Sequence, residues 1–355
     1  MKAETTIGGK SKHIQWGLDI VLFLFAFIFL GGYNYEYLYK VQNCSLFIGN
    51  SIFFNETLEH SSGPLLFASR YLTQFLIYPW LGAFLLALGL VGIKQLLYLL
   101  NDKDNNWVGV YYLPSLLILL AQTIIGYTIY ANFENAFVVE LELGILLSCG
   151  LALGMKTIYN RFNLIGIGIS AVISIFLFFA VGIFANLALL LLGTAIVRND
   201  KKAGAVTIVT SIVLQLLLAH IGSTYCQNEE YVRALFSPLP DSVYTNVFTC
   251  SIIAILSCAV VLLFNTIKLN HGKFQLHINI GIATLGLLAV CLFSNHDTNF
   301  RTELKLQHLT EEHKWNEVIE EANKLENPTN ITAAYRFLAL NQTGRLWNEV
   351  FAFPC

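Results

Sequence analysis

Long apolar segments alternate with short polar ones along most of this chain. Nine apolar segments are candidate membrane spans, and they cover residues 16–33, 77–99, 108–130, 137–155, 164–181, 183–197, 203–221, 247–267 and 276–293. A helix that crosses the ~30 Å hydrocarbon core of a bilayer needs about 20 apolar residues. The segments lack the alternating pattern of a membrane β-strand, and lipid offers no hydrogen-bond partners to an open backbone. The pattern therefore predicts an all-α, polytopic transmembrane helix bundle with about nine spans.

The fifth and sixth candidate spans form one continuous apolar stretch from Leu164 to Val197, in which only Gly182 and Asn186 suggest a turn. A single long helix here would invert the orientation of every later span. Basic residues lie just before and just after the stretch, and a hairpin places both basic groups on the same side of the membrane. We therefore expect a hairpin.

The basic residues between the spans indicate how the chain is oriented. With nine spans, only Lys40, Arg70 and Arg233 lie on the outer side before the carboxy-terminal tail. Lys and Arg gather on the cytoplasmic side of membrane proteins, so this distribution predicts a multi-pass protein with a cytoplasmic amino terminus and an extracytoplasmic tail. The first span has no small-residue cleavage site after it and is expected to remain as an anchor. The inner side carries twelve basic residues: Lys2, Lys10, Lys12, Lys94, Lys103, Lys156, Arg161, Arg198, Lys201, Lys202, Lys268 and Lys273.

Composition agrees with a membrane protein and narrows the choice of partners. Hydrophobic residues make up 55% of the chain, charged residues 12%, and the mean hydropathy is +0.60. Soluble proteins have about 25% charged residues. The net charge is −2, and membrane topology explains the few basic residues, so no basic patch remains to bind a polyanion. We therefore expect the lipid bilayer as a partner and no nucleic acid.

Two of the seven cysteines fall in the expected outer loops, where oxidation is possible. These are Cys44 and Cys226, and both a disulfide between them and two free thiols remain open. The cysteines inside the spans are interpreted as small apolar residues: Cys149, Cys250, Cys258 and Cys291.

The expected outer side has three large features: loops 34–76 and 223–246, and a tail over residues 298–355. The first loop is too long for a simple connector, because most connections are shorter than about 12 residues unless they are functional. Its second half, residues 64–75, is apolar with a polar stripe and predicts a helix in the membrane interface. The bundle itself is expected to occupy residues 1–297.

The tail contains a repeated sequence. Trp315-Asn316-Glu317-Val318 recurs as Trp347-Asn348-Glu349-Val350, Asn327-Pro328 ends one helical pattern, and Gly344 breaks another just before the second copy. The stretch resembles tetratricopeptide repeats, which pair two antiparallel helices in about 34 residues. The resemblance implies a small helical-repeat module. Since the second copy stops before its second helix, we expect a truncated version of a longer protein, or a partner that supplies the missing half.

Several acidic residues are candidates for chemistry on the outer side. Glu140 and Glu142 lie one turn inside the fourth span, and residues two apart on a helix point in different directions. We expect one of them to face an outward-opening cavity; the alternative is separate solvation of each group at the interface. The other groups expected around this cavity are Glu36, Glu56, Glu59, His60, Glu134 and His220. Asp19, in the first span, is interpreted as a carboxylate that reaches water near the cytoplasmic end.

Motifs of specific chemistry are absent from the sequence. Asp102-Lys103-Asp104 has the Asp-x-Asp spacing of some sugar transferases, but it is interpreted as a solvated turn. The sequence has no metal-ligand spacing, no nucleophile elbow and no phosphate-binding loop. No metal site and no cofactor site is predicted.

Two further resemblances concern function. The segment from Gly63 to Ala83 is similar to the first outer loop and second span of a bacterial family of inner-membrane proteins with a repeat-bearing outer tail, known only as a domain of unknown function. That resemblance implies a location and an architecture. The layout also resembles polytopic glycosyltransferases that use lipid-linked sugars and need a carboxylate near the membrane surface. It implies Glu36, Glu56 and Glu59 as candidates, although none lies in a matching acidic motif.

Three functional hypotheses follow. The first is a multi-pass inner-membrane protein whose outer tail presents a helical-repeat surface to a protein partner. The second is a glycosyltransferase-like enzyme that takes a lipid-linked sugar donor at the outer membrane face. The third is a transporter, for which the sequence shows no pair of matching halves.

Overall fold

The computed structural model describes residues 2–60, 62–101, 107–130, 136–225, 231–239, 245–264, 275–325 and 327–349. Helices account for nearly all of these residues, and no β-strand occurs among them. The expectation of an all-α chain is confirmed for this part of the protein.

Six described helices are long and apolar enough to cross a membrane. They are the part of α1 (Lys2–Ile28) and η1 (Phe29–Tyr33) after Gln15, α5 (Pro79–Leu100), α7 (Phe137–Phe162), α8 (Leu164–Val181), α10 (Lys201–Tyr225) and α12 (Thr245–Phe264). A seventh candidate combines α13 (Gln275–Phe293) with α14 (Thr298–Glu311), which are bent by 76° relative to each other. The nine expected spans are reached only if two shorter apolar helices also cross the membrane.

The third expected span, residues 108–130, is divided into three helical pieces. These are η3 (Val108–Tyr111), α6 (Tyr112–Thr123) and η4 (Gly126–Tyr130). Gly126 has a φ of +54°, a left-handed conformation that ends the α-helix. The carbonyl of Thr123 at the end of α6 accepts a hydrogen bond from the Asn295 backbone N–H at 3.2 Å. A tertiary contact thus replaces the lost helical hydrogen bond.

The expected hairpin between the fifth and sixth spans is present. Helix α8 ends at Gly182, which has a φ of +60°, and α9 (Ile183–Ile196) then packs back against α8. The backbone N–H of Ile183 donates to the carbonyl of Ser237 at 2.9 Å. This contact ties the turn to the segment after α11 (Tyr231–Phe236).

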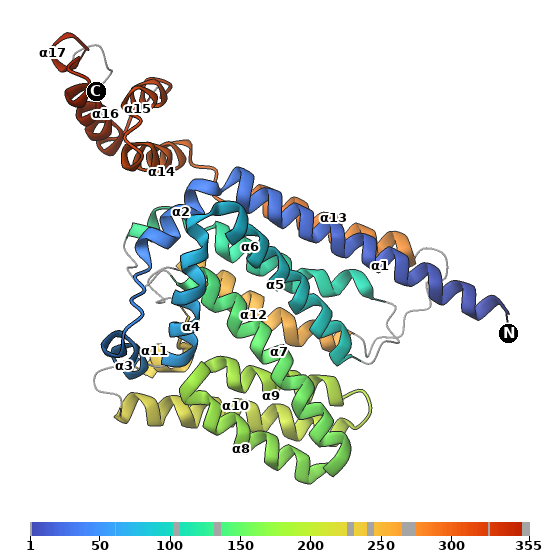
Figure 1. The fold of residues 1–355 in the computed structure, drawn as a ribbon. Coiled ribbons are helices and arrows are strands. Elements are labelled where there is room, and N and C mark those ends of the chain that lie inside the picture. The colour runs from blue at the N-terminus through green and yellow to red at the C-terminus, as the bar shows by residue number, and fades with distance from the viewer. Residues whose placement is uncertain are drawn as a thin grey trace.

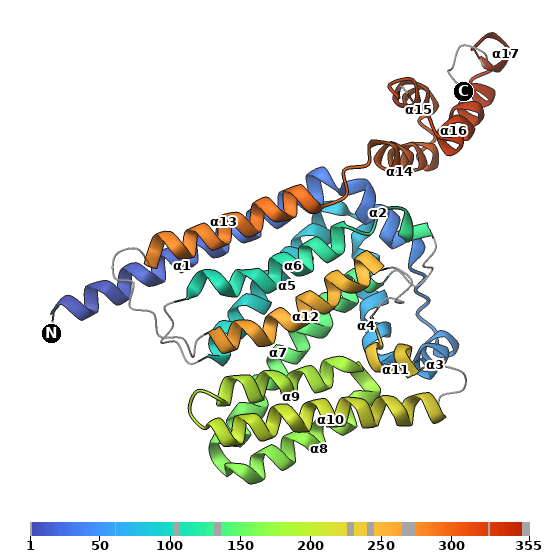
Figure 2. The same ribbon diagram turned by 180° about the vertical axis from the view of Figure 1, so that it is seen from behind.

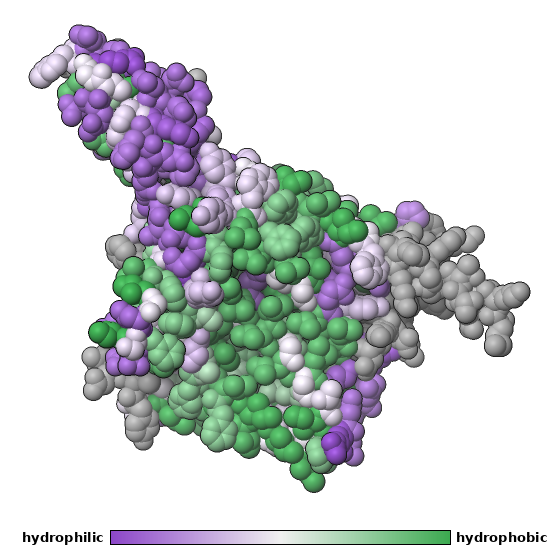
Figure 3. Space-filling model, viewed as in Figure 1, coloured by the Kyte–Doolittle hydropathy of each residue, from purple (hydrophilic) through white to green (hydrophobic). Residues whose placement is uncertain are grey.

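The bundle is built from packed helices that place the two chain ends far apart (Figures 1 and 2). Helix α5 packs on α1, α6 and α7, and α9 packs on α7, α8, α10 and α12. Most of the buried apolar side chains belong to one continuous core. Exposed apolar side chains such as Phe176, Leu285 and Leu292 cover much of the outside. Figure 3 shows one face of the bundle as a broad green surface. Lipid covers such a surface in membrane proteins.

The first expected outer loop folds into α2 (Tyr35–Cys44), α3 (Ser51–Glu59), α4 (Gly63–Thr73) and η2 (Gln74–Ile77). Helix α4 coincides with the predicted interfacial helix and packs on α7 and α8. Asn50 caps α3 by accepting a hydrogen bond from the Phe53 N–H at 2.7 Å. Cys44 forms no disulfide with any cysteine that the structure describes. Cys226 lies outside the described residues, so the pairing of the two stays a prediction.

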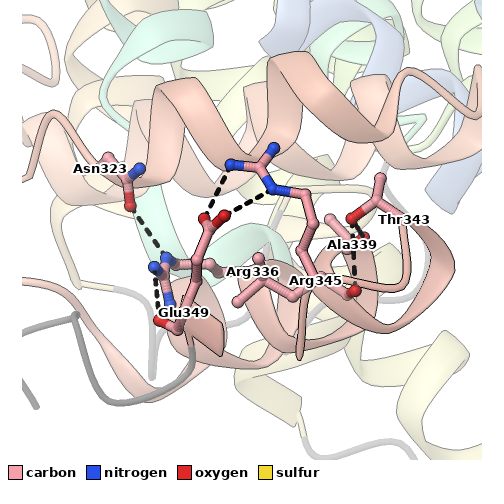
Figure 4. Close-up of polar contacts among 7 residues, drawn as sticks. Asn323, Arg336, Ala339, Thr343, Arg345 and Glu349 are labelled. Atoms are coloured by element: carbon pink, nitrogen blue, oxygen red, sulfur yellow. Dashed lines mark hydrogen bonds and ion pairs between the residues drawn. The ribbon is translucent and has the colours of Figure 1, made fainter. Parts of the chain in front are cut away.

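The last helices, α14, α15 (Trp315–Ala322), α16 (Asn330–Gln342) and α17 (Leu346–Glu349), form a module that projects from one end of the bundle (Figure 1). The module has its own apolar core, which includes Leu306, Val318 and Leu340. Figure 4 shows how Arg336 joins the end of α15 to α17 by donating to Asn323 Oδ1 at 2.9 Å and to the Glu349 carbonyl at 3.1 Å. Its surface is largely hydrophilic, unlike that of the bundle (Figure 3).

Candidate functional site

A buried ion pair joins three helices of the bundle. The ammonium group of Lys94 on α5 lies 2.7 Å from Oδ1 of Asp19 on α1, and the Lys94 side chain is 1% exposed. The hydroxyl of Tyr112 on α6 donates to the same oxygen at 2.7 Å. Gln95 donates to the other carboxylate oxygen of Asp19. The ammonium group also lies 4.9 Å from the centre of the Tyr112 ring.

This ion pair corrects two interpretations made from the sequence. Asp19, expected to reach water, is buried, and Lys94, counted among the basic residues of the inner side, is buried against it. An unpaired charge inside a membrane bundle is costly, and a partner of opposite charge offsets much of that cost. The single lysine inside the apolar segment of α5 indicated a buried charge that needs a partner. The sequence did not identify that partner, because Asp19 lies 75 positions earlier in the chain.

A second buried carboxylate, Glu142 on α7, lines a cavity. Its side chain is 4% exposed, and Nε2 of Gln122 on α6 donates to Glu142 Oε2 at 2.7 Å. The same Gln122 amide donates to the carbonyl of Val138 at 3.0 Å, which fixes its orientation. The cavity has a volume of about 130 Å³. Gly89 on α5 faces the carboxylate, and a Cβ atom at this position would collide with Glu142 Oε1.

The other candidate residues are spread over the molecule. Glu140 is buried one turn from the start of α7, whereas Glu56, Glu59 and His60 are exposed on or next to α3. His220 is exposed near the end of α10, and its ring lies 6.3 Å from that of Tyr231.

Glu134, the remaining member of the expected cavity, lies outside the described residues. Among the residues that the structure describes, no three His, Cys, Asp or Glu side chains lie close enough together to hold a metal ion. The assignment of a function to any of these groups stays a prediction.

Glu36 lies where the bundle meets the C-terminal module. It lines a small cavity of about 20 Å³ together with Arg301 of α14. The Arg301 guanidinium stacks on the ring of Tyr33, with its central carbon 3.4 Å from the ring centre. Arg301 also donates to Oδ1 of Asn34 at 2.8 Å and to the Tyr33 carbonyl at 3.3 Å. One arginine thus connects the module to the end of the first span.

A second set of contacts holds α14 against α2. Lys40 donates to Gln307 Oε1 at 2.8 Å, and the ring of Tyr39 lies edge-on to that of His308, with centres 4.3 Å apart. Partial burial and the neighbouring carboxylate of Glu311 raise the pKa of the Tyr39 hydroxyl. The hydroxyl therefore stays protonated at physiological pH, and no negative charge from Tyr39 opposes the acidic end of α14.

Comparison with known proteins identifies a family but no activity. Residues 12–355 match the family described as a family of unknown function, DUF6057. No curated protein and no solved structure matches the chain.

Proposed function

This chain belongs to the DUF6057 family, and we propose that it is a multi-pass inner-membrane protein whose C-terminal module offers a helical-repeat surface to a protein partner outside the cytoplasm. The proposal has three parts: the number of crossings, the rigid attachment of the module, and the surface that the module exposes. Each part has its own support among the described residues.

Nine crossings are supported by the direction in which neighbouring helices run. Lys156, near the end of α7, donates to the carbonyl of Leu100 at the end of α5, at 2.7 Å. Near their other ends, Leu86 of α5 and Val139 of α7 line one cavity. Helices α5 and α7 are therefore parallel, so the chain between them must return across the bundle. Among the described residues between α5 and α7, the broken segment that contains α6 supports this return.

Helices α8, α9 and α10 support the same count. Asn186 of α9 accepts a hydrogen bond from Ser174 of α8 at 2.6 Å and donates to Gln215 of α10 at 2.7 Å. Ser174 and Gln215 both lie in the second half of their helices, whereas Asn186 lies in the first half of α9. Helix α9 therefore runs opposite to α8 and α10, as a short crossing would.

The amino terminus and the C-terminal module lie at opposite ends of the bundle, as an odd number of crossings requires (Figure 1). Together with the excess of basic residues near the amino terminus, this supports a cytoplasmic amino terminus and an outer module. The contacts of Arg301 and Lys40 with the loop between α1 and α3 support a module that is held at a fixed orientation to the membrane.

The arrangement of α14–α17 supports the resemblance to tetratricopeptide repeats. Helix α14 packs on both α15 and α16, and α15 packs on α16. The tryptophans of the two sequence copies lie at similar places, because Trp315 is the first residue of α15 and Trp347 the second of α17.

The single observation that carries the proposal is the exposure of large apolar side chains on this otherwise hydrophilic module. Trp347 is 86% exposed. On α16, Ile331 is 43% exposed and Leu338 is 40% exposed, and together with exposed Ala334 they form a stripe at helical spacing on the side away from the core. Exposed tryptophan and aliphatic side chains of this kind are typical of protein-binding surfaces.

A photo-crosslinking experiment in cells tests this surface. A benzophenone amino acid is placed at Leu338 or Trp347. The control positions are Glu320 on the polar face of α15 and Lys324 in the turn after α15. We expect one discrete adduct from the first two positions and none from the controls. The adduct should be lost when Ile331→Asp is added to the Leu338 probe. Equal adducts at all four positions, or no adduct at the first two, would contradict the proposal.

The glycosyltransferase-like activity is kept as a second candidate because Glu36 lies beside Arg301 at the outer end of the bundle. The cavity there holds little more than one water, so a sugar would require the module to move. Glu56 and Glu59 are exposed on α3, where a donor could reach them. Separate Glu36→Gln, Glu56→Gln and Glu59→Gln variants that all retain normal cell-surface glycans would eliminate this candidate.

A further inference from the structure

The cavity at Glu142 combines apolar walls with one buried carboxylate. Its walls come from the end of α4 and from η2, from α5 and from α7. Apart from Glu142, the lining residues have no polar side chain: Leu72, Leu76, Leu85, Leu86, Gly89, Val139, Leu143 and Leu146. A cavity of this composition favours hydrocarbon over water along nearly all of its surface.

The two oxygens of the Glu142 carboxylate have different surroundings. Oε2 accepts the hydrogen bond from Gln122. Oε1 lies against Gly89, another residue of the cavity wall, and no hydrogen bond to it occurs among the described residues. A carboxyl oxygen that faces an apolar cavity without a partner costs free energy. A ligand with a hydrogen-bond donor would recover that cost.

The cavity adjoins the surface that lipid covers. Leu88, next to Gly89 on α5, is 53% exposed, and Leu147, next to Leu146 on α7, is 40% exposed. Leu85, Leu143 and Leu146 are half-buried at its edge. Glu142 is the sixth residue of α7, so it lies about 8 Å from the start of that helix at 1.5 Å per residue. Gly89, which touches Glu142, is the eleventh residue of α5 and lies about 15 Å from the start of that helix, so the cavity lies in the first half of both helices.

From these observations we propose that the cavity binds a membrane lipid with a free hydroxyl group, which donates a hydrogen bond to Glu142 Oε1. The hydroxyl lies at Glu142, in the first half of α7, and the adjoining part of the hydrocarbon chain lies between α5 and α7. The volume of about 130 Å³ is similar to that of an engineered apolar cavity of about 150 Å³ that binds benzene, so several methylene groups fit. Gly89 is required because any side chain there would displace the carboxylate or fill the site.

A photolabelling experiment tests the proposal on the full chain. The protein is reconstituted in nanodiscs of phosphatidylcholine, which has no free hydroxyl, and a diazirine-bearing hexadecanol is the probe. The matched probe is its methyl ether, which has the same chain but no donor. We expect the alcohol to label the segments of α5 and α7 around Gly89 and Glu142 about ten-fold more strongly than the ether, as one hydrogen bond to a carboxylate predicts. Peptide mass spectrometry measures the labelling.

Four variants assign the labelling to the cavity. Gly89→Leu fills it and should reduce labelling by the alcohol about ten-fold. Gly150→Leu makes the same change on α7 at a place with open space around the new side chain, and it should label as the unchanged protein does. Glu142→Leu should abolish the preference for the alcohol over the ether, whereas Glu142→Gln, which keeps an acceptor, should retain part of it.

Four results would overturn the proposal. One is equal labelling by the alcohol and the ether in the unchanged protein, and another is undiminished labelling in folded Gly89→Leu. A third is an amine-bearing probe that labels more than ten-fold above the alcohol, which would instead indicate a cationic lipid. If Gly89→Leu does not fold, a competition experiment replaces it, in which unlabelled hexadecanol should suppress labelling of the unchanged protein. The fourth result that would overturn the proposal is labelling that unlabelled hexadecanol does not suppress.

Discussion

The ammonium group of Lys94 and the carboxylate of Asp19 lie 2.7 Å apart at the meeting point of α1, α5 and α6. Tyr112 and Gln95 complete the hydrogen bonds of the carboxylate. The first span is otherwise largely exposed along its length, with Trp16, Ile20 and Leu24 on the outer surface. The ion pair is therefore a specific contact by which α1 is held in register against the rest of the bundle.

Replacing one partner of this pair should be far more harmful than replacing both. Lys94→Met leaves the Asp19 carboxylate buried without a counter-charge, and we expect a loss of about 3–5 kcal/mol in stability. The double variant Asp19→Asn with Lys94→Met should recover most of that loss, because no buried charge remains. Thermal unfolding of the purified protein in detergent measures both. A double variant less stable than the single one would show that the pair is not the main interaction of these residues.

Arg301 should control the attachment of the C-terminal module. Arg301→Ala removes the stacking on Tyr33 and the hydrogen bonds to the bundle, so we expect a loss of about 1–3 kcal/mol in the docking of α14. Hydrogen exchange over residues 298–311 should become faster, while exchange in α7 should not change. Lys324→Ala is the control, because the Lys324 side chain is 66% exposed and pairs with Glu321 of its own module. Equal exchange in both variants would contradict this role.

The turn between α8 and α9 should tolerate no side chain. Gly182→Ala places a Cβ atom on a backbone with a φ of +60°, where it would also collide with the Ser237 carbonyl oxygen. We expect a loss of about 1–3 kcal/mol from strain. Gly168→Ala, on the exposed side of α8 with open space around it, should be neutral or stabilising by up to about 1 kcal/mol. Unfolding midpoints that fall equally in the two variants would show that only helix propensity matters here.

The proposed outer position of the C-terminal module depends on the side of the membrane on which each end of the chain lies. A reporter that is active only in the cytosol, fused after Cys355, should be inactive, and a periplasmic phosphatase at the same place should be active. Fusion of either reporter to the loop after α5 should give the opposite pattern, because that loop is expected on the inner side. An active cytosolic reporter at Cys355 would mean an even number of crossings.

Much of the helical architecture follows from the sequence, since an apolar segment in lipid can satisfy its backbone only as a helix. The expected helices at residues 77–99 and 164–181 match α5 and α8 closely. The hairpin at Gly182 was also predictable, because basic residues flank the apolar stretch on both sides. The break in residues 108–130 was not, since its lost hydrogen bond is replaced by Asn295, far away in the chain.

The sequence by itself determined that the chain is a set of apolar helices with a more polar C-terminal module, because hydrophobicity and charge act residue by residue. Only the tertiary structure decided which polar groups are buried together. Asp19 meets Lys94 and Gln122 meets Glu142 across helix boundaries. Such pairings depend on how each helix is rotated in the bundle, and the packing of whole helix faces sets that rotation.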